Sequence, residues 1–171
     1  DDLPWIAPLM TFIRAAHDAD VPMVGVCFGH QIIAHALGGY AAKSNRGWGL
    51  GIHRVKLHNH PDWMPADDDI RLIHIHQDQV VAVPQDATLI GSTSFCTNAM
   101  FHMGDNVFCM QGHPEFTPDY TAALMETRRD RMGEDRVDHA LHTLKDDHEG
   151  VEIAGWSATF FRQHAQNRIA A

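Results

Sequence analysis

The chain has 171 residues, 44% of them hydrophobic and 20% charged, which is typical of one globular domain with enough apolar material for a core. Its formal net charge of −9 comes without any block of lysine and arginine, which argues against general nucleic-acid binding or attachment to a membrane surface. No segment approaches the roughly 18 apolar residues of a membrane span, and the first residues lack the pattern of a signal peptide. The three cysteines are an odd, sparse set, so we expect a protein of the reducing cytoplasm rather than a disulfide scaffold.

The first elements predicted along the chain are a helix, a strand and a second helix. Apolar residues recur at helical spacing over 3–18 and predict an amphipathic helix. A short strand is expected at 21–26. The next helix, 29–37, ends at Gly38-Gly39, because glycine accommodates the backbone that closes a helix.

The middle of the chain consists mainly of short apolar segments separated by turn residues. The polar segment 58–69 is expected to be a loop, and Asp105-Asn106 is a plausible hairpin turn. Strands are expected at 52–57, 70–76, 88–92, 99–103 and 107–110.

The last third of the chain has a helical pattern, with glycines between its segments. Trp156, Phe160 and Phe161 follow helical spacing and are expected to pack on the sheet. No linker or repeat separates this part from the rest, so we expect a single domain, 1–171, with a core at 1–117 and a helical tail at 118–171. The helices expected in this tail are 118–132, 134–146 and 150–167.

A cysteine stands where a predicted strand meets a predicted helix. Cys27 lies between Gly25 and Gly29, and such glycines permit the tight strand-to-helix turn that presents a nucleophile above a sheet. At a helix N-terminus the helix dipole favours the thiolate form of the side chain. The alternative is a buried structural cysteine in a tight turn.

A histidine with a nearby carboxylate follows the last predicted strand. Pro114 keeps His113 out of a helix, so the imidazole is expected on an extended loop at the end of the strand. Glu115 is two residues away and can orient the ring, as a base that accepts a thiol proton requires. Alone, this segment could be a surface turn; together with Cys27 it indicates nucleophilic catalysis.

The joint pattern resembles the class I, triad-type glutamine amidotransferase domain. The matching segments occur in family order over 21–116, and the helical tail carries no comparable motif. They are Val24 to Gln31, Gly38-Gly39, Gly47-Trp48-Gly49, His76 to Val80 with Pro84, and Gln111 to Glu115.

This resemblance implies an α/β fold with a flavodoxin-like, doubly wound, mostly parallel sheet. It also implies hydrolysis of the glutamine side-chain amide to glutamate and ammonia, with no cofactor. Cys27 would be the nucleophile that forms a γ-glutamyl thioester, His113 the general base and acid, and Glu115 the residue that orients His113.

The resemblance also implies residues that bind the substrate. The backbone N–H of Phe28 would stabilise the oxyanion, and Gln31 matches a position that contacts substrate glutamine. The backbone around His76, Gln77 and Asp78 matches the segment that receives the amino-acid end of the substrate, although many relatives have glycine in place of Gln77.

The start of the chain departs from the family pattern. The family has strands and a glycine-rich loop before the nucleophile, and that loop supplies a second oxyanion donor, whereas no glycine precedes Gly25 here. We therefore expect a chain that lacks its N-terminal strands. Losing one oxyanion donor costs roughly 10²- to 10³-fold in rate elsewhere, so we expect residues 1–171 alone to be poorly active or unstable.

The histidine content does not predict a metal site. The chain has 14 histidines, and His74 and His76 would share one face of a strand. No Cys-x-x-Cys or His-Glu-x-x-His spacing accompanies them, so no metal site is expected.

The sequence is compatible with three functions. The first is a glutaminase that delivers ammonia to a synthase partner or another acceptor. The second is a stand-alone cysteine hydrolase of the same fold that cleaves other γ-glutamyl bonds. The third is a catalytically weak regulatory domain, which the presence of Cys27, His113 and Glu115 argues against.

Overall fold

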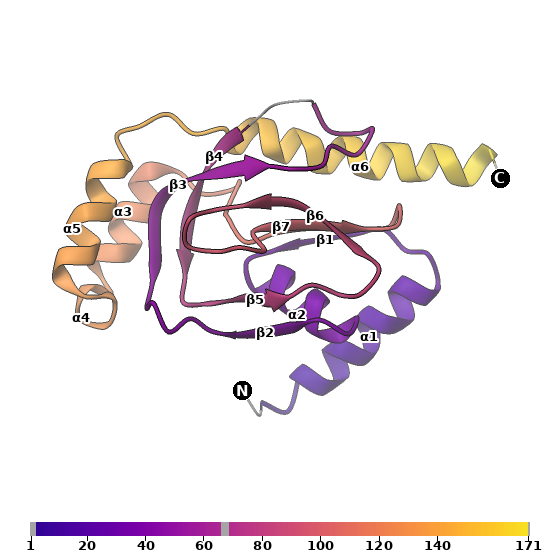
Figure 1. Cartoon of the computed structure of the whole chain (residues 1–171), viewed down its shortest axis with the longest axis horizontal. Helices are drawn as coiled ribbons and strands as arrows, with labels where there is room; N and C mark the ends of the chain where they lie inside the picture. The colour runs from indigo at the N-terminus through magenta and orange to yellow at the C-terminus, as the bar shows by residue number, and fades with distance from the viewer. Residues whose placement is uncertain (1–2, 66–68, 171) are drawn as a thin grey trace.

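The structure is a computed structural model that describes residues 3–65 and 69–170 (Figure 1). Residues 66–68 of the expected loop lie outside the described residues, as do Asp1, Asp2 and Ala171. Among the helices in the described ranges, none is long and apolar enough to cross a membrane.

The main sheet has six strands in the order β1-β8-β7-β6-β3-β4. Each of these strands overlaps one expected from the sequence, because each contains a continuous or alternating apolar run. They are β1 (Met23–Val26), β3 (Gly49–Leu57), β4 (Asp69–His76), β6 (Ala87–Ser92), β7 (Met100–Met103) and β8 (Val107–Met110).

The pairing within this sheet is mixed. β1 and β8 are parallel neighbours, whereas the pairs β8–β7, β7–β6, β6–β3 and β3–β4 are antiparallel. β7 and β8 form a hairpin at the expected Asp105-Asn106 turn, where Gly104 adopts a φ of 52°, and so short a connection permits only an antiparallel pair. The α/β class is confirmed, and the expectation of a mostly parallel sheet is refined: within the described chain the parallel pairing is that of β1 with β8.

A separate two-stranded antiparallel sheet was not expected. It consists of β2 (Tyr40–Lys43) and β5 (Asp78–Ala82), with Lys43 opposite Asp78. Neither strand has a long apolar run, and each obtains its ladder hydrogen bonds from the other, which is a tertiary effect.

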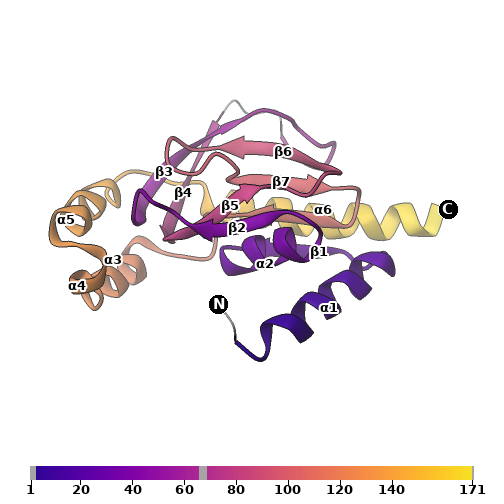
Figure 2. The same ribbon diagram turned by 60° about the horizontal axis from the view of Figure 1, so that its bottom comes forward.

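Helices cover both faces of the main sheet. α1 and α2 lie on one face and α6 on the other (Figures 1 and 2). The side chains of β8 alternate accordingly: Cys109 packs in the core beneath α1 and α2, whereas Phe108 and Met110 pack in the core beneath α6. The helices are α1 (Ile6–Asp18), α2 (Phe28–Ala36), α3 (Pro118–Glu126), α4 (Arg129–Met132), α5 (Glu134–Thr143) and α6 (Gly150–Ala170).

α6 belongs to the core of the molecule rather than to a free tail. Trp156 and Phe160 are buried against the sheet, as expected. The prediction for Phe161 was wrong, since its side chain is 41% exposed. One residue further along a helix points about 100° away from its predecessor, so Phe160 and Phe161 cannot both face the sheet.

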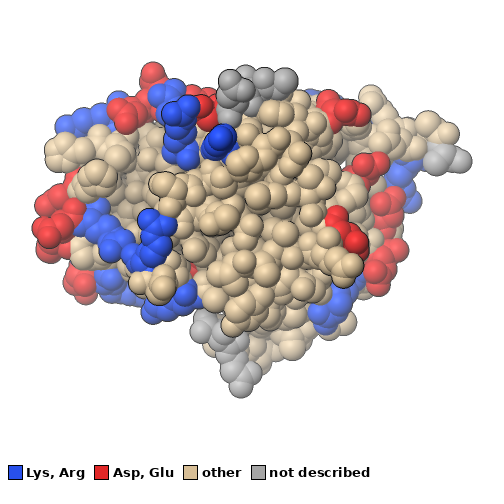
Figure 3. All heavy atoms as spheres, in the orientation of Figure 1, with Lys and Arg blue, Asp and Glu red and all other residues tan. Residues whose placement is uncertain are grey.

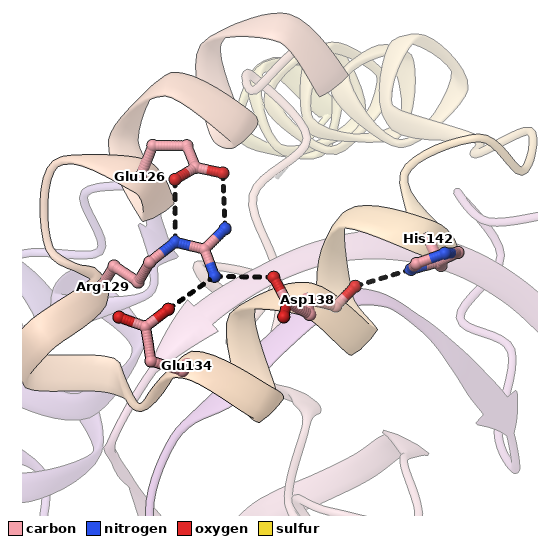
Figure 4. A network of polar contacts seen from close by, with 5 residues as sticks. All are labelled: Glu126, Arg129, Glu134, Asp138 and His142. Atoms are coloured by element: carbon pink, nitrogen blue, oxygen red, sulfur yellow. Dashed lines mark hydrogen bonds and ion pairs between the residues drawn. The ribbon is translucent and has the colours of Figure 1, made fainter.

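The remaining helices pack beside β3 and β4 in a third core. The single helix expected at 118–132 was wrong: α3 ends at Glu126 and α4 begins at Arg129. Arg129 binds the carboxylates of Glu126 at 2.6 Å, Glu134 at 3.0 Å and Asp138 at 2.6 Å, as Figure 4 shows. The break therefore lets one guanidinium join three helices.

Candidate active site

Cys27 occupies the sharp turn between β1 and α2. Its φ of 51° lies in the left-handed region, which is uncommon for a residue with a side chain. Gly25 makes this turn possible, because a Cβ at that position would lie 2.8 Å from the backbone of Gly29 and 2.9 Å from Cys109 Sγ. A Cβ on Gly29 itself would meet nothing within 4 Å, so the close approach restricts the side chain at position 25 and not the one at position 29.

The thiol of Cys27 is half-buried and has two polar neighbours. Gln111 Nε2 donates to Cys27 Sγ at 3.5 Å, and the thiol lies 4.0 Å from the carbonyl oxygen of Ile75. Burial raises the pKa of Cys27 to about 11; the Phe28 N–H and Gln111 oppose this rise, and Glu115 adds to it. The expected preference for thiolate at the helix N-terminus is therefore outweighed by burial, and the resting side chain is a thiol at neutral pH.

His113 is buried and fixed on three sides. Its backbone N–H donates to the carbonyl of Ile73 at 2.8 Å, and its ring stacks on Phe116 with centroids 3.9 Å apart and planes 9° apart. Nδ1 lies 2.8 Å from Glu115 Oε1. Since the carboxylate accepts, Nδ1 carries the proton and Nε2 is left as the basic nitrogen.

The topology brings Cys27 and His113 to the same edge of the sheet. Val26, the last residue of β1, lies beside Met110, the last residue of β8, and the N–H of Cys27 donates to the Met110 carbonyl at 2.9 Å. His113 follows β8 closely, and adjacent parallel strands end at the same edge. The two groups also contact the same strand, β4, through Ile75 for Cys27 and Ile73 for His113.

A cavity of about 650 Å³ lies next to this edge. Phe28, Gln31, Gln77 and Asp78, four of the five expected substrate-binding residues, line it together. The fifth, His76, does not: its ring is buried, and its Nδ1 donates to the carbonyl of Asp78 at 3.0 Å.

Gln31 is held between this cavity and the thiol. Its Nε2 donates to the Asp78 carbonyl at 2.7 Å and to Gln111 Oε1 at 3.1 Å. Gln111 in turn donates to Cys27, so the three side chains form one chain of hydrogen bonds. Gln111 and Phe116 were not predicted as site residues, although both lie within three residues of His113.

The clustered histidines form a buried, uncharged group. His74 stacks on His53 with centroids 4.7 Å apart and lies 5.3 Å from His76. Burial lowers the pKa of His76 to about 4 and that of His30 to about 3, and holds the pKa of His74 well below its ordinary value. Within the described ranges, no group of three or more His, Cys, Asp or Glu side chains is arranged to hold a metal ion.

Comparison with known families agrees with the fold and with the sequence motifs. The family model "Glutamine amidotransferase class-I" matches residues 4–128. The chain therefore belongs to the class-I glutamine amidotransferase family.

Relatives of the chain include enzymes of different kinds. The chain is 32% identical to "Gamma-glutamyl peptidase 3" of Arabidopsis thaliana over 73% of this chain and 53% of that protein. It is 35% identical to a glutamine-hydrolyzing GMP synthase subunit of Halobacterium salinarum over 56% of this chain and 54% of that protein. A crystal structure of a glutamine amidotransferase from Thermotoga maritima has the same fold, with a TM-score of 0.75 and 20% identity over 94% of this chain and 70% of that one. The chain spans about half the length of the curated relatives it matches.

Proposed function

We propose that this chain cleaves γ-glutamyl amide bonds with Cys27 as nucleophile, His113 as general base and acid, and Glu115 as the residue that orients His113. The observation that carries the proposal is the common position of Cys27 and the His113–Glu115 pair at the ends of two adjacent parallel strands. A structural cysteine would need neither the left-handed turn nor the paired histidine.

The proposed reaction begins with proton transfer. With a pKa of about 11, the thiol of Cys27 needs a base at neutral pH, and Nε2 of His113 takes its proton as sulfur attacks the γ-carbonyl carbon. The Phe28 N–H, which already favours negative charge on the thiol, stabilises the oxyanion.

Collapse of the tetrahedral intermediate breaks the carbon–nitrogen bond. The leaving nitrogen takes the proton from His113, and a γ-glutamyl thioester remains on Cys27. Water, deprotonated by His113, then attacks the thioester, and glutamate leaves as the thiol is restored. Glu115 stabilises the imidazolium in both halves of the reaction.

The cavity beside Gln31 would hold the amino-acid end of the substrate. Lys43 and Asp78 stand opposite each other on β2 and β5 and both line this cavity. A γ-glutamyl group carries an α-carboxylate and an α-ammonium, so this pair of opposite charges suits it.

Two substrates fit this chemistry. Glutamine would give ammonia, and the relative named as part of a GMP synthase supports a synthase partner that receives it. A γ-glutamyl peptide would give an amino acid or peptide instead, and the relative named γ-glutamyl peptidase favours this second candidate. Either reaction would occur within a single cytoplasmic domain, in which the helices that follow residue 117 pack against the sheet.

Turnover measurements test the proposal. Glutamate release from glutamine and from γ-glutamyl dipeptides is measured with protein translated from the complete reading frame. We expect Cys27→Ala to abolish release and Cys96→Ala, at a buried cysteine outside the site, to retain it. Unchanged turnover by Cys27→Ala would refute the proposal, and the preferred substrate decides between the two candidates.

A further inference from the structure

A second and larger cavity lies between β3, α5 and the loop that follows β6. Its volume is about 1150 Å³, and its lining shares no residue with that of the cavity beside Gln31. The opening exists because β3 pairs with β6 only at Lys56–Ser92 and Leu57–Gly91, so the two strands diverge beyond these pairs. We refer to it as the β3 groove.

The β3 groove is positively charged although the chain as a whole carries a net charge of −9. Asp69 supplies a negative charge to the lining, and it forms an ion pair with Arg54. Within the described parts of the chain, Arg46, Lys56 and Arg136 have no carboxylate within ion-pair distance. Figure 3 shows blue Lys and Arg side chains gathered on the face over β3 and α5.

The two arginines of the groove that lack a carboxylate partner, Arg46 and Arg136, are held in place by backbone carbonyls. Arg46 Nη1 donates to the carbonyl of Ser94 at 2.6 Å, and its guanidinium lies 4.9 Å from the centre of the Phe95 ring. Arg136 Nη1 donates to the carbonyls of Arg46 at 3.0 Å and Trp48 at 2.8 Å. These bonds fix each guanidinium without neutralising it, and a guanidinium has five N–H donors, so others remain for a ligand.

The third cation lies close to the first. Lys56 is opposite Ser92 in the sheet, and Arg46 binds the carbonyl of Ser94 two residues further on. Two residues of extended chain span about 7 Å, so Lys56 on β3 and Arg46 in the loop before β3 both lie beside the short segment 92–94. His53 also lines the groove. Burial is the largest cause that lowers its pKa, and the nearby charges of Arg46 and His139 lower it further.

We propose that the β3 groove binds a small polyanion, a molecule that carries two or more phosphate or carboxylate groups. A concave surface lined by charges of one sign concentrates ions of the opposite sign, and fixed guanidinium groups suit the planar or tetrahedral oxygens of such ligands. Ser92 and Ser94 line the same groove, and their hydroxyls can accept or donate further hydrogen bonds. The site is separate from the cysteine chemistry and does not depend on it.

Calorimetric titration at constant ionic strength tests this proposal. The two probes are pyrophosphate and tricarballylate, which distinguish a phosphate ligand from a carboxylate ligand. We expect saturable one-site binding of at least one probe, and Lys56→Gln should weaken it by about fivefold or more. Lys56 is exposed and makes no structural ion pair, so this variant is expected to fold.

Two controls make the result specific. Lys145→Gln removes the same charge from an exposed position outside the groove and should leave affinity within about twofold of the unmodified protein. Cys27→Ala should bind as tightly as the unmodified protein, so loss of catalysis and loss of polyanion binding are distinguishable. Absence of saturable binding of both probes would overturn the proposal, as would equal weakening by Lys56→Gln and Lys145→Gln.

Discussion

Gln111 donates a hydrogen bond from Nε2 to Cys27 Sγ at 3.5 Å, and its Oε1 accepts one from Gln31 at 3.1 Å. The same side chain therefore contacts the proposed nucleophile and a residue that lines the adjacent cavity. Because the amide N–H favours negative charge on sulfur, Gln111 lowers the pKa of a thiol that burial otherwise raises.

Removing this donor should make the thiol less acidic. In Gln111→Met we expect the midpoint of Cys27 alkylation by iodoacetamide to move to higher pH and turnover to fall about tenfold, as the loss of one such hydrogen bond implies. Gln85→Met, at an exposed glutamine, is the matched control and should change neither. An unshifted alkylation profile in Gln111→Met would show that this contact does not influence the thiol.

His113 and Glu115 should differ in the size of their effects. His113→Asn removes the proposed base, and we expect turnover to fall by about 10²- to 10⁴-fold. Glu115→Gln keeps a side chain of the same size, and since Glu115 is 53% exposed, we expect less than the roughly 10⁴-fold loss known for a buried triad carboxylate. Steady-state kinetics measure both, and a larger loss in Glu115→Gln than in His113→Asn would contradict the assigned roles.

The two glycines flanking Cys27 should respond in opposite ways to alanine. In Gly25→Ala the new Cβ would lie 2.8 Å from the Gly29 backbone, so we expect a loss of roughly 1–3 kcal/mol in the free energy of unfolding and reduced turnover. In Gly29→Ala the Cβ has open space within a helix, so we expect a gain of up to about 1 kcal/mol. Urea denaturation measures both changes, and equal stability of the two variants would refute the close approach at Gly25.

The sequence predicted those parts of the molecule that depend on local patterns. The strands at 70–76, 88–92 and 107–110 could be predicted because each contains enough apolar residues to indicate a strand without information from the rest of the chain. β2 and β5 were not predicted, since each depends on pairing with the other. The turn between α3 and α4 was missed for a similar reason: Arg129 is bound by carboxylates both before and after it in the chain.

In the candidate site, too, the residues with a local sequence signal were predicted and those that depend on the fold were not. Cys27, His113 and Glu115 were predicted because the glycines and the proline next to them in the sequence indicate a tight turn and an extended loop. Gln111 and Phe116 were missed because their contacts with Cys27 and His113 arise from the fold. The high pKa of the thiol could not be predicted either, since burial by distant segments causes it.

The buried histidines should make the fold sensitive to acid. Burial lowers the pKa of His30 to about 3 and that of His76 to about 4, from an ordinary value of 6.5, and lowers that of His74 as well. As pH falls below 6.5, these histidines bind protons in the unfolded chain but remain neutral in the folded chain. The free energy of unfolding is therefore highest above pH 6.5 and falls progressively toward pH 4.

His74→Leu should reduce this acid sensitivity. Removing one such histidine should lower the slope of the free energy of unfolding against pH by about 1.4 kcal/mol per pH unit in the acidic range just described. Neither ring nitrogen of His74 has a hydrogen-bond partner within the described chain, so we expect no loss of stability at pH 7. Denaturation at a series of pH values measures the slope, with exposed His142→Leu for comparison; an unchanged slope in His74→Leu would count against a neutral buried His74.

The central claim is that Cys27 forms a covalent γ-glutamyl thioester. Protein from the complete reading frame is mixed with glutamine or a γ-glutamyl dipeptide, quenched in acid within the first turnovers, digested, and analysed by mass spectrometry. We expect the mass of a γ-glutamyl group on the peptide that contains Cys27, its loss on treatment with hydroxylamine, and its absence in Cys27→Ala. Glutamate release without any acylated Cys27 peptide, or with the acyl group on Cys96 or Cys109, would contradict the account.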